Sequence, residues 1–220
     1  MYSFTKDTAT TILGAMKAKG YVIEHGLDGV EIQAVEKAFN ATLPSDYRIF
    51  LQTGIIKGYQ GLDKLNVRGF VDWRNPEAEA ASCKDWIENH VFRFDIEKNG
   101  YWHPELFGEK PRDMERAVQQ VLAIVRTWPP LFPIYIHRFI CSSPHEAGNP
   151  ILSVWQAVDT VYYGANLLDY MDREFKLGLD VAKKYPMGVA VPRPVIVPIW
   201  TKALFDMTMS GAHFNNQFKG

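Results

Sequence analysis

The stretch from Leu131 to Gly164, LFPIYIHRFICSSPHEAGNPILSVWQAVDTVYYG, contains apolar segments rich in β-branched and aromatic residues. Such segments, bounded by turn-forming residues, are typical of strands. They predict strands at Phe132–Ile140, Ile151–Gln156 and Thr160–Tyr163. The turn-rich segment Ser142–Pro150 joins the first two, and the short turn Ala157–Asp159 joins the last two. Connections this short favour an antiparallel meander.

Amphipathic segments before this stretch predict helices. Apolar residues recur at helical spacing over residues 5–19. Asp28 and Glu31 have the spacing of a capping box, which indicates the start of a second helix that ends near Asn40. Pro44 occupies the first turn of a short third helix, where its missing N–H costs nothing.

Helices are also predicted on either side of the strands. Residues 111–126 keep helical spacing over three turns, and this face is expected to pack on the sheet. Its apolar residues are Met114, Ala117, Val118, Val121, Leu122 and Val125. Asn166 is expected to cap a helix that ends at Phe175. In the C-terminal tail, the sequence predicts a short helix near 180–185, an extended Pro-rich segment at 192–198 and a last helix after Thr201.

The middle of the chain, residues 55–109, gives weaker signals. Phe70–Trp73 and His90–Ile96 are predicted strands, and Asn99 with Gly100 forms a turn. Together these elements predict one α+β domain over residues 1–220, with a mostly antiparallel twisted sheet packed against several helices.

The composition is that of an ordinary globular protein, with 47% hydrophobic and 22% charged residues. The apolar runs are too short to span a bilayer, and the N-terminus shows no secretory signal. Two cysteines, Cys83 and Cys141, cannot form a disulfide framework. We therefore expect a cytoplasmic protein without membrane contact. Without a dense Lys/Arg stripe, direct nucleic acid binding is disfavoured.

The charge is unevenly distributed along the chain. The segment Asp72–Glu109 holds nine acidic and four basic residues, an excess of five negative charges, and several aromatic residues. A place in the core explains most of these aromatic residues, but aromatic side chains beside charge are also common anchors of protein interfaces. The residues predicted to bind a partner are Asp72, Trp73, Glu77, Glu79, Asp85, Trp86, Glu88, Glu97, Tyr101 and Trp102. The basic tail from Lys176 onward is the next surface to consider.

Two residue pairs allow a catalytic or metal-binding alternative. His137 and Cys141 are four apart on a predicted strand, hence on one face, as a nucleophile pair or half a metal site requires. Tyr135 and Phe139 are expected on the same face, which favours a buried structural cysteine. His103 and Glu105 could ligate a metal, but zinc sites take about four ligands.

Carboxylate pairs are the remaining candidates for chemistry. Asp169 with Asp172, and Glu77 with Glu79, could act as acid and base, but a solvated helix face explains them more simply. The chain has no Gly-rich phosphate loop and no G-x-S-x-G elbow. The sequence therefore points to no catalytic residue, cofactor or metal.

Several short motifs follow one another in order along the chain. Residues 26–36 read G-L-x-x-x-E-I-x-x-V-E, and residues 43–51 read L-P-x-D-Y-x-x-F-L. Further motifs are FPI at 132–134, GNP at 148–150, SVWQ at 153–156, YYG at 162–164 and the segment 168–175. Taken in order, they resemble the SUKH superfamily, and DIEKNGYW at 95–102 and GEKP at 108–111 are similar to a bacterial branch of it. The resemblance covers roughly residues 26–178. The helix at 5–19 and the extension 179–220 lie outside it, and the family's frequent Asn-Gly-Gly is replaced here by Gln52-Thr53-Gly54.

The resemblance implies an α+β fold and a function in protein binding. The superfamily includes bacterial immunity proteins for polymorphic toxins and a fungal regulator of cell-wall synthesis, and it has no shared catalytic motif. It implies a non-enzymatic immunity protein that neutralises a cognate toxin, often a nuclease or deaminase. An acidic, aromatic surface would complement the basic cleft of such a toxin. The alternatives are a regulatory scaffold for a cellular client and, from another class, an enzyme or metal-binding protein.

Overall fold

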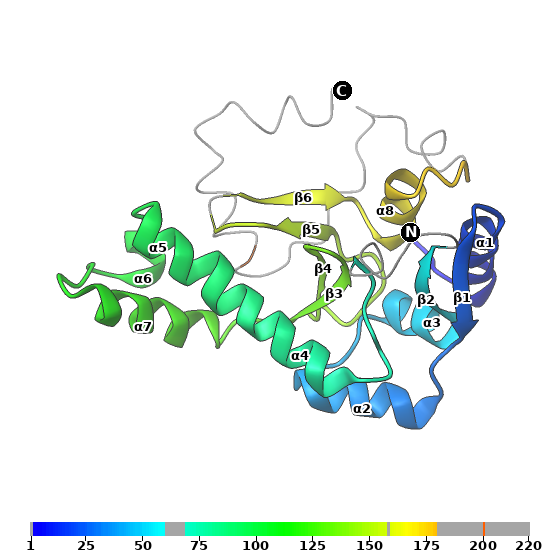
Figure 1. Cartoon of the computed structure of the whole chain (residues 1–220), viewed down its shortest axis with the longest axis horizontal. Coiled ribbons are helices and arrows are strands. Elements are labelled where there is room, and N and C mark those ends of the chain that lie inside the picture. Colours follow the sequence, from blue (N-terminus) through cyan, green and yellow to red (C-terminus); the bar gives the residue numbers. More distant parts are fainter. Residues whose placement is uncertain (1, 60–68, 158, 180–199, 201–220) are drawn as a thin grey trace.

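Two antiparallel sheets and several helices make up the fold (Figure 1). The computed structural model describes residues 2–59, 69–157, 159–179 and 200. The larger sheet has the order β3-β4-β5-β6, and the smaller pairs β1 with β2. The strands are β1 (Tyr21–His25), β2 (Gly54–Tyr59), β3 (Leu131–Tyr135), β4 (Arg138–Cys141), β5 (Ile151–Val154) and β6 (Thr160–Gly164). The predicted α+β class, with an antiparallel sheet packed against helices, is confirmed.

The predicted strand Phe132–Ile140 is in fact the hairpin of β3 and β4. Nine residues exceed the usual strand length of about five or six. The chain reverses at Ile136 and His137, and Ile136 adopts a left-handed φ of 51°. An isoleucine does not predict such a turn, because β-branched residues rarely adopt positive φ. The meander is therefore one strand longer than predicted.

The N-terminal helices follow their sequence signals. They are α1 (Lys6–Ala18), α2 (Gly29–Phe39) and α3 (Ser45–Thr53). The capping box of Asp28 and Glu31 is present, and Asn40 ends α2 in the left-handed conformation. Gly26 precedes α2 where a Cβ would lie 2.0 Å from the Gln52 carbonyl oxygen, so only glycine fits. The small sheet of β1 and β2 was not predicted.

A long continuous helix replaces the predicted strand His90–Ile96. It consists of α4 (Pro76–Asp85), the π-helical segment η2 (Trp86–Arg93) and α5 (Phe94–Lys98). The buried side chains Ile87, Val91 and Ile96 share one face because the π-helical turn absorbs the extra residue between helical repeats. The second predicted strand, Phe70–Trp73, is reduced to a single bridge between Phe70 and Tyr135.

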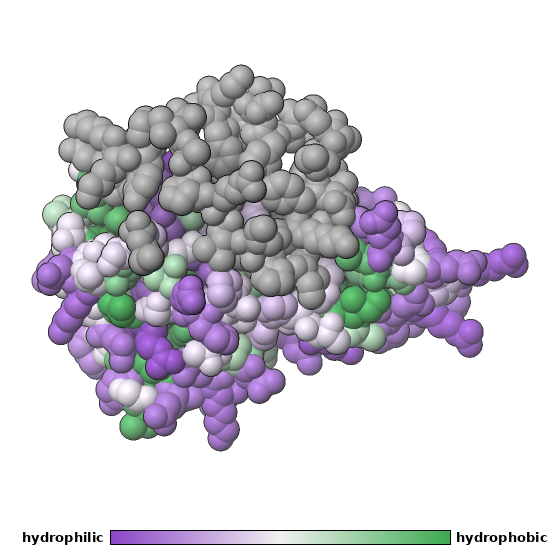
Figure 2. All heavy atoms as spheres, turned by 180° about the vertical axis from the view of Figure 1, so that it is seen from behind, coloured by the Kyte–Doolittle hydropathy of each residue, from purple (hydrophilic) through white to green (hydrophobic). Residues whose placement is uncertain are grey.

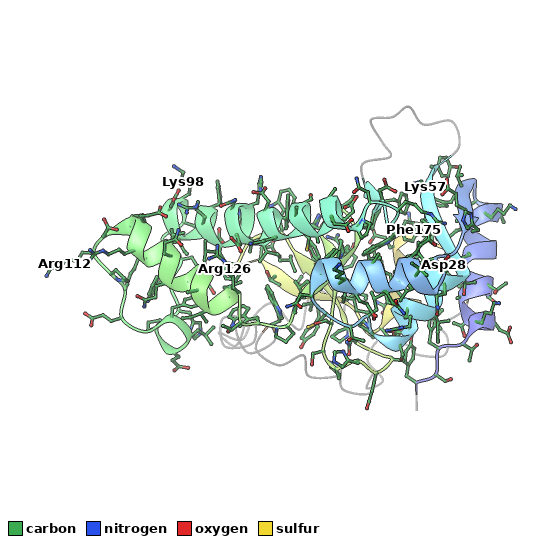
Figure 3. The ribbon with its side chains drawn as sticks, turned by 90° about the horizontal axis from the view of Figure 1, so that it is seen from below. Asp28, Lys57, Lys98, Arg112, Arg126 and Phe175 are labelled. Carbon is green, nitrogen blue, oxygen red and sulfur yellow. The ribbon has the colours of Figure 1, made fainter. Side chains whose placement is uncertain are left out.

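The far end of this helix forms a projecting arm with α6 (Pro104–Phe107) and α7 (Met114–Val125) (Figure 1). Lys98 and Arg112 lie at its far end, opposite Lys57 and Asp28 (Figure 3). The arm's tip is hydrophilic in the view from behind (Figure 2). The predicted buried face of α7 is confirmed except at Met114, which is 44% exposed. α7 packs mainly against η2, α5 and α6 rather than directly on the sheet.

The larger sheet has a hydrophobic cluster on each face, because successive strand residues point to opposite sides. The first cluster includes Phe132, Ile140 and Ile151 and is covered by α1, α2, α3 and α8 (Leu167–Glu174). The second cluster includes Phe139 and Leu152 and is covered by η2, α5, α6 and α7. Both clusters are anchored in the same strands, so the sheet joins the two halves of the molecule.

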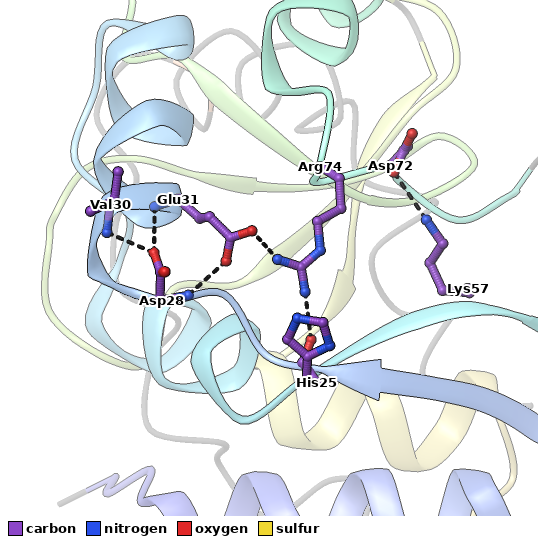
Figure 4. A network of polar contacts seen from close by, with 7 residues as sticks. All are labelled: His25, Asp28, Val30, Glu31, Lys57, Asp72 and Arg74. Carbon is purple, nitrogen blue, oxygen red and sulfur yellow. Dashed lines mark hydrogen bonds and ion pairs between the residues drawn. The ribbon is translucent and has the colours of Figure 1, made fainter.

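Polar contacts fix the segment that enters the long helix (Figure 4). Arg74 pairs with Glu31 at the start of α2, and it also donates to the His25 carbonyl oxygen at 2.9 Å. Lys57 pairs with Asp72 at 3.0 Å. These contacts tie residues 72–74 to both β1 and β2, so the start of α4 has a defined direction.

The C-terminal predictions lie mostly outside the described residues. This applies to the helix near 180–185, the Pro-rich piece and the helix after Thr201. The predicted cap of α8 is confirmed, because Asn166 accepts from the Asp169 N–H at 3.0 Å. None of the helices in the described ranges has both the length and the apolar character that crossing a bilayer requires.

Candidate protein-interaction surface

One face of the long helix borders the sheet and carries both polar and aromatic residues. Glu79, Cys83, Trp86 and His90 recur at intervals of four, three and four residues, which brings them onto one side of a helix. The Trp86 indole N–H donates to the Val154 carbonyl oxygen at 2.9 Å. This bond fixes the indole against the end of β5.

Two turns of the sheet bring further large side chains to Trp86. The indole of Trp155, just after β5, has its centroid 5.5 Å from that of Trp86, and His137 lies 5.0 Å from Trp155. The His90 ring also stacks on Trp86, with the ring centroids 5.1 Å apart and only 11° between the planes. We call Trp86, His90, Ile136, His137 and Trp155 the aromatic shelf.

Two large apolar side chains of the shelf are exposed to solvent. Ile136 is 57% exposed and Trp155 is 47% exposed, whereas most residues of their size are buried in the sheet. Single exposed apolar residues are normal on protein surfaces, but neighbouring ones beside aromatic rings are typical of interaction sites. The shelf therefore has the composition of a protein-binding surface.

A small cavity of about 140 Å³ opens beside the shelf. Its walls come from the start of the long helix, the segment before it and strands β3 and β4. They are Gly69, Phe70, Val71, Glu79, Ser82, Cys83, Trp86, Pro133, Ile136 and Phe139. We call this cavity the shelf pocket. It combines apolar walls with one carboxylate and one hydroxyl.

A larger cavity of about 400 Å³ lies on the opposite side of the Cys83 position. It is mostly apolar and separates the end of α2 from the base of the arm, with Trp128 and Trp200 among its walls. Burial raises the pKa of the Cys83 thiol, which lines both cavities, to about 12. This thiol is therefore protonated at neutral pH and a poor nucleophile.

The structure separates the predicted acidic residues of the partner surface. Glu88 forms a two-bond ion pair with Arg126, at 2.7 and 2.9 Å, and this contact lowers the pKa of its carboxyl group. Asp72 and Glu97 are paired with Lys57 and Arg93. Asp85 lies 3.6 Å from His90, Glu77 is exposed and Glu79 lines the shelf pocket. Asp72, Glu88 and Glu97 are therefore each paired with a cation in space.

The aromatic residues predicted to bind a partner also lie in different parts of the structure. Trp73 is buried in the first cluster beside Phe39 and Tyr47, and Tyr101 is buried in the second. Trp102 lies on the arm, where its indole N–H donates to the Gly108 carbonyl oxygen at 2.9 Å. Among the predicted residues, only Glu79, Asp85 and Trp86 lie at the shelf or beside it.

The surroundings of His137 and Cys141, the first alternative catalytic pair, differ in part from the prediction. Cys141 is buried in the second cluster, and burial raises its pKa to about 11. His137 is partly buried, which lowers its pKa. The expectation that Tyr135 shares a face with Phe139 and Cys141 is wrong, because the turn at Ile136 places Tyr135 in β3 against Phe70.

The remaining titratable candidates are more buried or more scattered than predicted. The solvated face expected for Asp169 and Asp172 is wrong, since both are buried, and Asp169 pairs with Arg173 at 2.7 Å. His103 precedes α6 with its Nδ1 buried, and Glu105 is exposed. Within the ranges that the structure describes, no three His, Cys, Asp or Glu side chains are grouped as a metal site requires.

Sequence reasoning missed Ile136, His137 and Trp155 as surface residues. The signal for the first two was the length of the apolar run, which exceeds an ordinary strand and so requires a turn. Trp155 follows the buried Val154 directly and precedes a short turn, the position at which a strand leaves the core. His90 was not identified as a neighbour of Trp86, because its segment was predicted to be a strand.

Comparisons with known proteins give no relative: no protein-family model matches the chain, and no curated protein or solved structure is significantly similar to it.

Proposed function

We propose that this chain is a non-enzymatic protein-binding module, and specifically an immunity protein that binds and neutralises a cognate polymorphic toxin in the cytoplasm. The observation that supports binding is the aromatic shelf, where Ile136 and Trp155 are exposed beside Trp86. The immunity role rests on the resemblance of the sequence motifs to the SUKH superfamily. The toxin would be a nuclease or deaminase.

The shelf gives this proposal a more specific surface than the acidic segment as a whole. Interface anchors are large, partly rigid side chains near the centre of a contact. Trp86 is held by its bond to Val154, and Trp155 packs against both Trp86 and His137. Such residues lose little conformational freedom on binding, so they contribute more of their burial energy to affinity.

The experiment is site-specific photocrosslinking in the native host, with a benzophenone amino acid at Trp155. The matched control carries it at Val30, an apolar residue at the start of α2 that is 75% exposed. We expect one crosslinked partner at position 155 and none at position 30. Mass spectrometry should identify that partner as a toxin domain.

A second measurement links the contact to neutralisation. Cells that express the toxin should grow when they also carry the wild-type chain or V30D, and should stop growing with I136D/W155A. Full protection by I136D/W155A, with a normal circular dichroism spectrum, would place the interface elsewhere. A crosslinked cellular protein without toxic activity would favour the regulatory scaffold instead.

A further inference from the structure

We propose that the shelf pocket receives an arginine side chain of the bound partner, with Glu79 as its counter-ion. This inference rests on the proposed protein-binding function and names the chemistry of the contact. The pocket volume of about 140 Å³ is well below the range of about 300–1,000 Å³ that encloses whole small-molecule ligands. It fits one long side chain better than a free cofactor.

Glu79 is held in place, and no cation in the described part of the chain pairs with it. Its Oε1 accepts from the Asp72 backbone N–H at 2.9 Å, which fixes the carboxylate at the pocket wall. Among the described residues no Lys, Arg or His pairs with it, in contrast to Glu88 and Glu97 on the same helix. The nearby Lys57 is already paired with Asp72. A partly buried carboxylate without a counter-ion favours the entry of a cation.

The other walls match the remainder of an arginine. Phe70, Val71 and Phe139 provide apolar surface for a methylene stem, because long basic side chains bury their stems and keep the charge at a polar group. Trp86 provides an aromatic wall, to which a guanidinium binds better than to an aliphatic one. The Ser82 hydroxyl adds an acceptor.

Arginine fits this set better than lysine. The planar guanidinium can bond a carboxylate and a second acceptor at once while it lies against an aromatic ring. The pocket walls from β3, β4 and the turn between them are Pro133, Ile136 and Phe139, which add no competing positive charge. A toxin that grips phosphate with arginines carries the required side chain.

The test uses small probes without any partner protein. Wild-type protein is titrated with N-acetyl-arginine amide, N-acetyl-lysine amide and the uncharged isostere N-acetyl-citrulline amide, and Trp fluorescence and amide NMR shifts are followed. We expect millimolar affinity for the arginine probe, as suits one side chain. The citrulline probe should bind at least about tenfold more weakly, which is the effect of one charge-assisted hydrogen bond.

Two variants locate the site. E79Q should reduce the affinity for the arginine probe at least about tenfold, whereas E109Q, which removes one negative charge elsewhere in the acidic segment, should leave it unchanged. No binding of the arginine probe, equal binding of citrulline, or equal binding by E79Q would overturn the proposal. The probe comparison in wild-type protein needs no variant, so misfolding of E79Q would not obscure it. Crosslinking at Trp155 decides the proposed function separately.

Discussion

The two faces of the larger sheet are covered in different ways. The first face is closed by α1, α2, α3 and α8 and reinforced by buried polar bonds. Tyr47 donates to the Pro133 carbonyl oxygen at 2.7 Å, and Asp46 accepts from the Gly148 N–H at 2.9 Å. The second face is covered by the arm, whose cover ends at Trp86 and leaves Trp155 and Ile136 exposed.

This difference shows which edge of the sheet leaves large apolar side chains uncovered. Buried polar bonds specify one arrangement of the first face and leave no large apolar side chain of the sheet exposed there except Tyr163. On the second face, Ile136 in the turn after β3 and Trp155 directly after β5 are exposed. The proposed binding surface therefore lies at the edge of the less enclosed face.

The largest expected effect on stability comes from truncating a large buried side chain in either hydrophobic cluster. Phe132→Ala in the first cluster should lower the free energy of unfolding by about 3–5 kcal/mol, and Leu122→Ala in the second by about 2–5 kcal/mol. Both side chains are fully or almost fully buried. Chemical denaturation followed by circular dichroism measures the loss, and a cost within about 0.5 kcal/mol would mean that the face in question is not packed.

The same pair of variants tests whether the faces unfold together. Because β3, β4 and β5 contribute residues to both clusters, we expect one transition in each variant. Tryptophan fluorescence and far-ultraviolet circular dichroism should then coincide. Two separate transitions would show that the arm and the N-terminal half are independent units.

The next effect is a pH dependence from Asp46. Burial raises the pKa of this carboxyl group from 3.8 to about 6. Its folded form binds a proton more tightly than its unfolded form, so its stabilising contribution is present below about pH 4 and is lost as the pH rises through 6. The change is about 3 kcal/mol, from roughly two pKa units at 1.36 kcal/mol each.

Urea unfolding at pH 4, 5, 6 and 7 measures this contribution as the difference between wild-type protein and Asp46→Asn. The variant cannot ionise, so its stability should fall less over this range than that of wild-type protein. Parallel curves for the two proteins would refute the assignment to Asp46. The comparison cancels other carboxyl groups such as Glu88, whose pKa is lowered by Arg126 and which titrates at lower pH.

A smaller effect is expected from the bond between Tyr47 and Pro133. Tyr47→Phe removes the hydroxyl and leaves the carbonyl oxygen without this buried donor, at a cost of about 1–3 kcal/mol. Tyr163→Phe is the matched control, since Tyr163 is 40% exposed and should change stability by less than about 0.5 kcal/mol. Thermal denaturation of both variants checks this, and equal costs would mean that the buried hydroxyl of Tyr47 stabilises the first face no more than an exposed one does.

The smallest effect on stability should come from the shelf itself. Ile136→Asp removes an exposed apolar side chain and should change the free energy of unfolding by no more than about 0.5 kcal/mol. Its effect on partner binding should nevertheless be large, because a charge would enter an apolar contact. Denaturation together with the toxin-protection assay separates these outcomes, and a stability loss above about 2 kcal/mol would make Ile136 a structural residue.

Sequence patterns were reliable where the determining interactions are local. The box of Asp28 with Glu31, the cap at Asn166 and the helical spacing of residues 117–125 each act within about one or two turns of chain. The segment 90–96 failed for the opposite reason. Its alternating apolar residues favour a strand, but continuation from α4 and packing on α7 favoured a helix.

The sequence by itself determined the class of the fold, the antiparallel meander and the ends of most helices. Caps, turns and apolar periodicity depend on residues that are close together in the sequence. Only the tertiary structure decided which acidic residues keep a free charge, because Arg126 and Lys57 come from distant parts of the chain. It also decided that Trp73 is core and Trp155 is surface. Exposure depends on what the rest of the chain packs against a residue, and no local pattern contains that information.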